Sequence, residues 1–426
     1  MQVLSSPIFL AYMTGGFLFI TLLAGGYPAW VVSALNTIMT VKGKLTTGRK
    51  HYLRNTLMVV QFVLSSLLII CTFIAWQQLQ YLRNKPLGYN KEEIISIPIG
   101  STIESEKAIT LLRGRLAREP RVISVSAADI NMGRGRDGSS QTSIVGFDYK
   151  DRSVKTHWQL IDYDYLKTFG IQLLQGRDFS REYGIDSLAV VINEQMAKQL
   201  GEKEVIGTML PISDDSKYQV IGVVKDFHFK SLHREIAPLS MTIRRDWPLQ
   251  YIFVRVQGGA LASSLEMVKK AWKEVDPSNL FEASFLNENT DRQYQKETRM
   301  SKIFMSGAVL TILISCMGLF AIVLLVIVQR TREIGIRKVL GAGVTHIVTL
   351  VSKDFVKLVL IGIIIATPLA WYAMNAWLQD FAYRIQIQWW VFVLAGLAAL
   401  LIAFITLSFQ SIKAALSNPV KSLRSD

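Results

Sequence analysis

Few residues of this 426-residue chain have the types and spacing that catalysis or metal binding requires. His228 and His233 suggest a zinc site, but no third ligand, HExxH or CxxC accompanies them at a useful spacing. We interpret the two histidines as a strand end followed by a turn. Asp214 and Asp215 occupy a turn rich in Pro, Ser and Asp, where we expect solvated carboxylates. The sequence therefore predicts no catalytic residue, no metal site and no enzyme activity.

The sequence also shows no nucleotide-binding motif. No P-loop pattern, G-x-x-x-x-G-K-S/T, occurs in it. Residues 133–138 match G-x-G-x-x-G, but residues 141–146 are typical of a strand and not of a helix whose N-terminus could hold a pyrophosphate. We predict a mobile external loop at this position and no cofactor in this chain.

The composition indicates membrane spans together with a soluble domain. Hydrophobic residues make up 50% of the chain and the mean hydropathy is +0.29, yet 19% of residues are charged and the net charge is +14. No zinc-finger or RNP-like aromatic motif accompanies the basic excess, so we expect no nucleic-acid partner. Cys71 and Cys316 both lie in apolar runs, which leaves the extramembrane part without a disulfide.

Five uncharged stretches are long enough to cross about 30 Å of hydrocarbon, which takes roughly 20 helical residues. They lie near residues 7–31, 55–77, 303–329, 358–379 and 386–410. None contains a charged side chain, which argues against a proton-coupled or ion-coupled carrier. Gly307, Gly318 and Pro368 lie within these stretches and permit close helix packing or a kink.

Basic residues between the apolar stretches predict the orientation in the membrane. Residues 42–54 carry five Lys or Arg and no acid, residues 330–338 carry four basic residues against one acid, and residues 413–424 add three more basic side chains. These segments share one side if the N-terminus and residues 78–302 lie on the other. The positive-inside rule then places the N-terminus and residues 78–302 outside and the C-terminus inside.

Residues 78–302 have the pattern of an α+β domain. We expect a strand at 94–99, a helix at 104–119 and a strand at 122–130, and later a strand at 251–256, a helix at 261–275 and a strand at 281–286. The residues between these two groups are rich in strands. Two βαβ units around such a middle predict one α+β subdomain interrupted by a second. A returning stalk helix should follow at about 290–302.

Residues 329–343 form a short polar segment between two apolar runs and are too charged to stay in lipid. As a helix, this segment places Ile336, Val339 and Leu340 on one face, and Gly341 supplies a C-terminal stop. Around that face lie the charged residues Arg332, Glu333, Arg337 and Lys338. We predict a helical elbow at the membrane surface. The plainer alternative is a solvated basic loop that only fixes topology.

Residues 331–342, with the sequence TREIGIRKVLGA, closely resemble the signature of the FtsX/MacB-like permeases, the membrane subunits of type VII ABC transporters. Residues 176–179, 190–197 and 218–228 resemble sequence segments of the periplasmic core domain of that family. The resemblance implies a membrane α-helical fold of about five transmembrane helices with a large α+β extracytoplasmic domain. It also implies docking on a separate ATPase subunit, which binds the ATP. The docking residues would be Arg332, Glu333, Ile334, Gly335, Ile336, Arg337, Lys338, Val339, Leu340, Gly341 and Ala342.

The same resemblance implies a division of the chain. Residues 1–45 would be the last transmembrane helix of a preceding permease unit, because residues 36–42 and 418–424 are similar tails. The remaining parts would be a transmembrane helix and stalk at 50–82, the periplasmic core domain at 83–289, and a stalk with a three-helix permease domain at 290–426. Within the core domain we expect porter-like parts at about 91–135 and 240–288 and an inserted β-rich lobe at about 136–239. The chain would then be the C-terminal half of a longer two-unit permease, or the product of a gene that begins late.

The function implied by the resemblance is that of a non-catalytic permease subunit in the bacterial cytoplasmic (inner) membrane. It would couple ATP hydrolysis by the separate ATPase to movement of its periplasmic domain, for export, efflux or extraction of a substrate. Expected partners are the ABC ATPase, a second permease unit or a homodimer, membrane lipid, and a periplasmic adaptor or outer-membrane protein. The alternative is an FtsX-like regulator or sensor that controls a cell-wall hydrolase or a signalling partner. A third candidate, an enzymatic ectodomain, is disfavoured because no triad, metal or carboxylate motif occurs.

Overall fold

The computed structural model describes residues 7, 10–19, 21–22, 50–138, 142–183, 186–213, 216–244, 247–329, 336–337, 340 and 343–416. They belong to two compact units, Met1–Val60 and Gln61–Asp426. In the first unit, a short apolar helix covers Leu10–Phe19. Most of the remaining predicted span at 7–31, and both similar tails at 36–42 and 418–424, lie outside the described residues.

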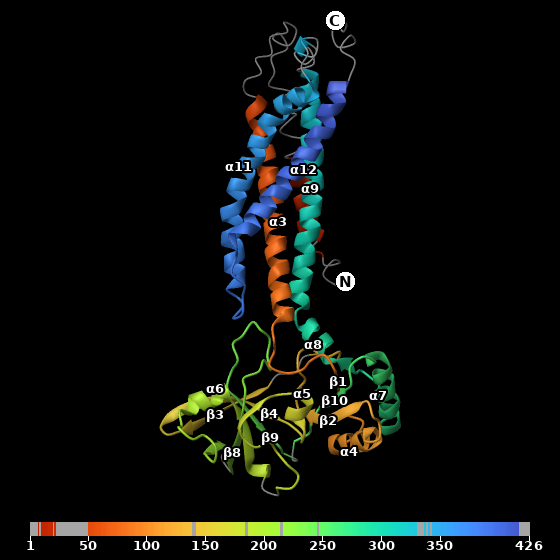
Figure 1. Ribbon diagram of the computed structural model, residues 1–426, viewed down its shortest axis with the longest axis vertical. Coiled ribbons are helices and arrows are strands. Elements are labelled where there is room, and N and C mark those ends of the chain that lie inside the picture. The colour runs from red at the N-terminus through yellow and green to blue at the C-terminus, as the bar shows by residue number, and fades with distance from the viewer. Residues whose placement is uncertain are drawn as a thin grey trace. The chain divides into compact units, whose positions relative to one another are not determined.

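Four helices in the described part of the chain are long and apolar enough to cross a membrane. They are α3 (Lys50–Asn84), α9 (Gln295–Gln329), α11 (Val344–Leu378) and α12 (Trp389–Leu416). Four of the five predicted spans are therefore confirmed as helices, and α11 continues through Pro368. α12 packs against both α9 and α11 (Figure 1).

Two glycines lie where neighbouring helices come close together. A Cβ atom on Gly362 of α11 would lie 2.9 Å from the Cβ of Phe62 in α3, so these helices approach too closely for a larger residue. A Cβ on Gly318 of α9 would lie 3.0 Å from the side-chain oxygen of Gln61, whereas one on Gly307 would meet its nearest atom at an ordinary 3.7 Å. The close packing expected of Gly307 and Gly318 thus applies to Gly318, and Gly362 adds a closer contact.

The α+β domain contains a four-stranded antiparallel sheet in the order β11-β1-β10-β2. Its elements are β1 (Ile94–Pro98), α4 (Ser105–Leu116), β2 (Val122–Ala128), β10 (Tyr251–Val256), α7 (Leu261–Val275) and β11 (Ser284–Phe285). β10 lies between the parallel strands β1 and β2, and β1 lies between β10 and β11, so the two βαβ units interlock as in ferredoxin-like folds. Ile95, Ile97 and Val254 project from alternate strand positions to pack with Trp272 of α7.

The predicted strands and helices of this sheet are confirmed with one exception. The strand expected at 281–286 is reduced to Ser284–Phe285, because Leu286 already begins α8 (Leu286–Gln293). α8 is followed by α9 after a break at Tyr294, so the expected stalk at 290–302 is formed by the end of α8 and the start of α9.

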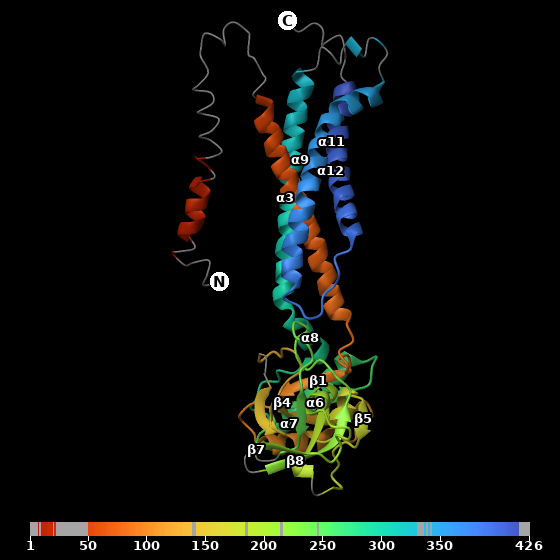
Figure 2. The same ribbon diagram turned by 90° about the vertical axis from the view of Figure 1, so that its left-hand side faces the viewer.

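A second, mixed sheet of seven strands is inserted between β2 and β10, in the order β3-β4-β9-β6-β8-β5 with β7 on β8 (Figure 2). Its elements are β3 (Ser143–Tyr149), β4 (Arg152–Leu160), α5 (Tyr165–Phe169), β5 (Leu173–Gly176), η1 (Asp186–Leu188), β6 (Ala189–Asn193), α6 (Glu194–Leu200), β7 (Met209–Ser213), β8 (Ser216–Val224) and β9 (Leu239–Thr242). β9 pairs with β4 and β6, so this sheet continues past the boundary expected near residue 240. β8 ends at Val224, four residues before the expected end at 228, and a loop leads from there to β9.

The two sheets share one apolar core. Phe253 of the four-stranded sheet packs against Phe169 with ring centroids 4.9 Å apart, and Met241 of the inserted sheet belongs to the same buried cluster. The glycine-rich loop at 133–138 lies against α8, because the Arg134 N–H donates to the Asn289 carbonyl at 2.9 Å. As expected, a strand and not a helix follows this loop.

Candidate functional site

The predicted docking segment is described at Ile336, Arg337 and Leu340. The other predicted docking residues lie outside the described residues; they are Arg332, Glu333, Ile334, Gly335, Lys338, Val339, Gly341 and Ala342. Ile336 and Arg337 are helical, and the Leu340 N–H donates to the Ile336 carbonyl at 3.1 Å, as in one helical turn. Ile336 is 49% exposed and Leu340 is 80% exposed. Two large apolar side chains one turn apart therefore face outward next to each other.

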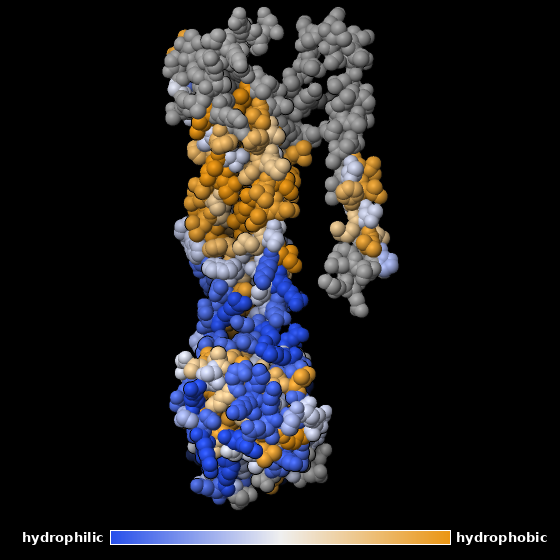
Figure 3. All heavy atoms as spheres, turned by 90° about the vertical axis from the view of Figure 1, so that its right-hand side faces the viewer, coloured by the Kyte–Doolittle hydropathy of each residue, from blue (hydrophilic) through white to orange (hydrophobic). Residues whose placement is uncertain are grey.

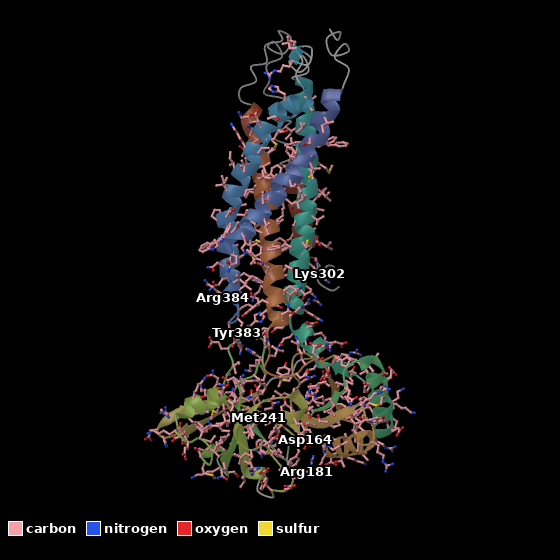
Figure 4. All side chains as sticks on the ribbon, viewed as in Figure 1. Asp164, Arg181, Met241, Lys302, Tyr383 and Arg384 are labelled. Atoms are coloured by element: carbon pink, nitrogen blue, oxygen red, sulfur yellow. The ribbon has the colours of Figure 1, made fainter. Side chains whose placement is uncertain are left out.

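At their other ends, α9 and α11 meet the α+β domain in an apolar cluster that we call the external joint. Its buried members are Leu79, Leu82, Leu87, Leu232, Tyr294 and Phe381. They come from α3 and the turn after it, the β8–β9 loop, the break between α8 and α9, and the connection between α11 and α12. Hydrophilic side chains cover the helices on the side of the α+β domain, next to an apolar band (Figure 3). Tyr383 and Arg384 mark the α11–α12 connection in Figure 4.

Gln78 of α3 is fully buried in this region and holds the α11–α12 connection with both ends of its amide. Its Nε2 donates to the Tyr383 carbonyl at 2.9 Å, and its Oε1 accepts from the Ile385 N–H at 2.9 Å. This pairing fixes the orientation of the amide, because only the nitrogen donates and only the oxygen accepts. A buried polar group without a partner costs about 1–3 kcal/mol, so the two bonds specify where the connection sits against α3.

His233, in the β8–β9 loop, contacts both α9 and the connection that follows α11. Its imidazole stacks on Phe381 with centroids 4.3 Å apart and lies 6.1 Å from the Tyr294 ring. Its Nε2 is 3.2 Å from the Glu297 carboxylate of α9, and its Nδ1 is 2.8 Å from the Ser231 hydroxyl. Since a carboxylate only accepts, Nε2 carries a proton. One side chain thus links the β8–β9 loop of the inserted sheet to the start of α9 and to the α11–α12 connection.

Backbone hydrogen bonds strengthen the same contact. The carbonyls of His233 and Leu232 accept from the N–H groups of Ala382 and Tyr383, at 3.1 and 3.4 Å. The Leu232 N–H in turn donates to the Tyr294 hydroxyl at 3.0 Å. The α11–α12 connection is therefore bonded to a loop that is itself bonded to the break between α8 and α9.

His228, also in the β8–β9 loop, packs against Tyr383 of the α11–α12 connection. Its ring packs edge-to-face on Tyr383 with centroids 4.8 Å apart, and the Lys85 ammonium lies 4.4 Å from the Tyr383 centroid. Burial, together with the positive charge of Lys85, lowers the pKa of His228 to about 4. The imidazole is therefore neutral at pH 7 and acts as an aromatic packing group.

The structure gives both histidines a structural role that the sequence did not indicate. Both lie in the loop that follows β8 and contact the α11–α12 connection. His233 is in a turn, as expected, whereas His228 lies four residues past the end of the strand. Across the residues that the structure describes, no three His, Cys, Asp or Glu side chains gather closely enough to hold a metal ion. Sequence reasoning missed Gln78, Phe381 and Tyr383. The available signals were a pair of glutamines at the end of an apolar run and two aromatic residues in a short connection.

Comparison with known families agrees with this architecture. Residues 64–270 match the MacB-like periplasmic core domain, and residues 305–419 match the FtsX-like permease C-terminal domain. The chain belongs to the FtsX/MacB-like ABC transporter permeases. This permease is thus a membrane protein whose long apolar helices carry a large α+β extracytoplasmic domain.

Several curated proteins are similar to this permease. The uncharacterized ABC transporter permease YknZ of Bacillus subtilis is 27% identical over 284 residues, which is 61% of this chain and 68% of YknZ. The macrolide export ATP-binding/permease protein MacB of Campylobacter fetus is 26% identical over 227 residues, or 50% of this chain. MacB of Escherichia coli O157:H7 is 24% identical over 217 residues, or 47% of this chain. This permease spans 35% and 32% of the lengths of those two MacB proteins.

Two solved structures are also similar. The periplasmic region of MacB from Actinobacillus actinomycetemcomitans aligns with 48% of this permease and 94% of its own chain, at 14% identity and a TM-score of 0.36. The extracellular domain of YknZ from Gram-positive bacteria aligns with 45% of this permease and 98% of its own chain, at 14% identity and a TM-score of 0.33.

Proposed function

We propose that this permease couples ATP hydrolysis by a separate ATPase subunit to movement of its α+β domain on the outer side of a bacterial cytoplasmic membrane. The chain performs no chemistry in this proposal. It transmits displacement between a docking surface on residues 329–343 and the external joint. The working assembly would contain a second permease unit or a second copy of the chain, and its movement would serve export, efflux or extraction of a substrate.

The exposed pair Ile336 and Leu340 carries the proposal. Removal of apolar surface from water is favourable by roughly 25 cal/mol per Å². Ile336 and Leu340 are still largely exposed in the described chain, so their burial by a partner would be favourable. Such adjacent apolar side chains are typical anchors that fill a groove on a partner. Their position inside a segment that resembles the docking signature of the family supports an ATPase as that partner.

Two long helices connect this surface to the external joint. α9 and α11 have 35 residues each, so each helix is roughly 50 Å long at 1.5 Å per residue. α9 runs from the joint toward the elbow, and α11 returns from the elbow to the joint (Figure 2). A displacement of the elbow therefore reaches the joint through Tyr294 on one side and Phe381 on the other.

The test is purification of the tagged full chain from native membranes in mild detergent, with identification of bound proteins by mass spectrometry. We expect an ABC ATPase with the natural chain and about tenfold less of it with Leu340→Asp, because a charge is then placed in the proposed interface. Leu280→Asp is the matched control, since Leu280 is 78% exposed in the α+β domain and receives the same charge. Equal recovery from both variants would refute docking through the elbow. Recovery of a hydrolase or signalling protein without an ATPase would favour the regulator instead.

A further inference from the structure

A cavity of about 410 Å³ opens in the α+β domain next to the external joint. Its wall contains Arg134 from the glycine-rich loop, Lys230 and Arg234 from the β8–β9 loop, and the hydroxyl groups of Thr142 and Ser231. None of the described residues in the wall is acidic. The cavity therefore combines three cationic side chains with neutral hydrogen-bond donors.

Three carboxylates on or beside the segments that form this wall are already engaged. Glu297 pairs with His233 at 3.2 Å, Glu288 pairs with Arg292 at 3.5 Å, and Asp137 accepts from the Tyr251 hydroxyl at 2.6 Å. Within the described part of the chain, neither Arg134 nor Lys230 nor Arg234 forms an ion pair. The positive charge of the cavity thus has no internal counterion among these residues.

Lys230 is held in place by a neutral partner. Its ammonium lies 3.0 Å from Nε2 of His157, and because an ammonium only donates, that nitrogen accepts. The proton of His157 is then on Nδ1, which donates to the Thr142 hydroxyl at 2.7 Å. Burial and the charges of Lys230 and Arg234 lower the pKa of His157 to about 4, and burial together with Arg234 lowers the pKa of Lys230. These positive groups repel one another, and a bound anion would relieve that repulsion.

We propose that this cavity binds a phosphate group, with oxygens that accept hydrogen bonds from Lys230, Arg234 and Arg134. Three cations with hydroxyl donors suit a phosphate, because charge-assisted hydrogen bonds are strongest to multiply charged oxygens. The volume accommodates a phosphate ester as well as the free ion. Gln293, the last residue of α8, also lines the cavity, so the group would bind where the α+β domain joins the helix bundle. Its source is either a lipid headgroup or a soluble phosphate compound.

The experiment uses the purified full chain and two probes. Inorganic phosphate is titrated calorimetrically into the chain in detergent, and native mass spectrometry compares retention of phosphatidylglycerol with that of neutral diglyceride of the same acyl chains. We expect saturable phosphate binding, weakened about tenfold or more by Lys230→Gln/Arg234→Gln. Lys230→Arg keeps the charge and should retain most of the affinity. Lys270→Gln/Lys273→Gln is the control. Both lysines are exposed on α7, which packs on the four-stranded sheet and contributes no residue to the cavity wall.

The two probes separate the two sources. Selective retention of phosphatidylglycerol that is lost in Lys230→Gln/Arg234→Gln would assign the site to a lipid headgroup. Phosphate binding that depends on the same residues, without selective lipid retention, would assign it to a soluble phosphate compound. Equal phosphate affinity in the cavity variant and the α7 control, or no saturable binding of either probe, would overturn the proposal.

Discussion

The imidazole of His233 stacks on the phenyl ring of Phe381, with centroids 4.3 Å apart and planes 27° apart. His233 belongs to the loop between β8 and β9 of the inserted sheet, and Phe381 belongs to the connection between α11 and α12. The contact therefore joins the extracytoplasmic domain to the connection that directly follows α11, the helix that begins after the elbow. The backbone bonds of Ala382 and Tyr383 lie beside it and depend on the same geometry.

Removal of the stacked ring should loosen these backbone bonds. Phe381→Ala is expected to lower the local opening free energy by about 1–3 kcal/mol, because it removes buried aromatic surface and the contact with His233. Hydrogen exchange of the peptide that contains Ala382 and Tyr383, followed by mass spectrometry, should then be faster by roughly 5- to 150-fold. Phe409→Ala, at a 68% exposed position of α12, should leave this exchange unchanged. Equal protection in both variants would show that the ring does not hold the joint.

The amide of Gln78 gives a second prediction. Gln78→Leu keeps the size of the side chain but leaves the Tyr383 carbonyl and the Ile385 N–H without their partner. We expect the free energy of unfolding in detergent to fall by about 2 kcal/mol, measured by chemical denaturation. Gln77→Leu is the control, since the amide of Gln77 makes no hydrogen bond among the described residues. An equally large loss of unfolding free energy in Gln77→Leu would show that the two hydrogen bonds of Gln78 have no specific role.

His228 should make stability depend on pH. Its pKa of about 4 in the folded chain lies below the ordinary 6.5, so the unfolded chain takes up the proton first as pH falls. Stability from the neutral, buried imidazole is therefore present above about pH 6.5 and is lost progressively as pH falls toward 4. This loss amounts to at most about 3 kcal/mol. His228→Phe should show a smaller fall in unfolding free energy between pH 7 and pH 4.5 than the natural chain.

The control for this pH effect is Phe381→Leu, which changes packing in the same joint but leaves the imidazole of His228 in place. It should lower the unfolding free energy by similar amounts at both pH values, so that the change of this free energy with pH is the same as in the natural chain. If His228→Phe shows the same change with pH as well, the imidazole does not cause the pH dependence.

Glycine substitutions test the closest helix contact. Gly362→Ala places a methyl group 2.9 Å from the Cβ of Phe62, so α3 and α11 must separate, at a cost of about 1–3 kcal/mol. The melting temperature in detergent should fall accordingly. Gly307→Ala should be neutral or stabilising, because its nearest neighbour, Leu68, lies at 3.7 Å and alanine favours the helix. The reverse order of the two melting temperatures would contradict the packing of α3 on α11.

Local patterns in the sequence predicted the four long helices and the strands and helices of the two βαβ units, because these features follow from hydrophobic period and charge. The interlocking of the two units was not predicted, and most of the predicted elbow lies outside the described residues. The external joint could not be predicted in this way. Gln78 and Tyr383 are about 300 residues apart, and His233 gives no local sign that its ring will meet Phe381. The same holds for Gly362, whose role depends on how closely α3 approaches. Such contacts arise from tertiary packing and not from the residues on either side.

The most direct test of coupling measures the external joint while nucleotide acts on the bound ATPase. A displacement of α9 relative to α11 would shear the bonds that Ala382 and Tyr383 make to the β8–β9 loop. Each purified chain, mixed with the same excess of the purified ATPase, is therefore compared with and without a non-hydrolysable ATP analogue, by hydrogen exchange of the peptide around residues 380–385. We predict a several-fold change in exchange for the natural chain and for Leu280→Asp, and none for Leu340→Asp. Identical exchange with and without nucleotide in the natural complex would contradict transmission from the elbow to the external domain.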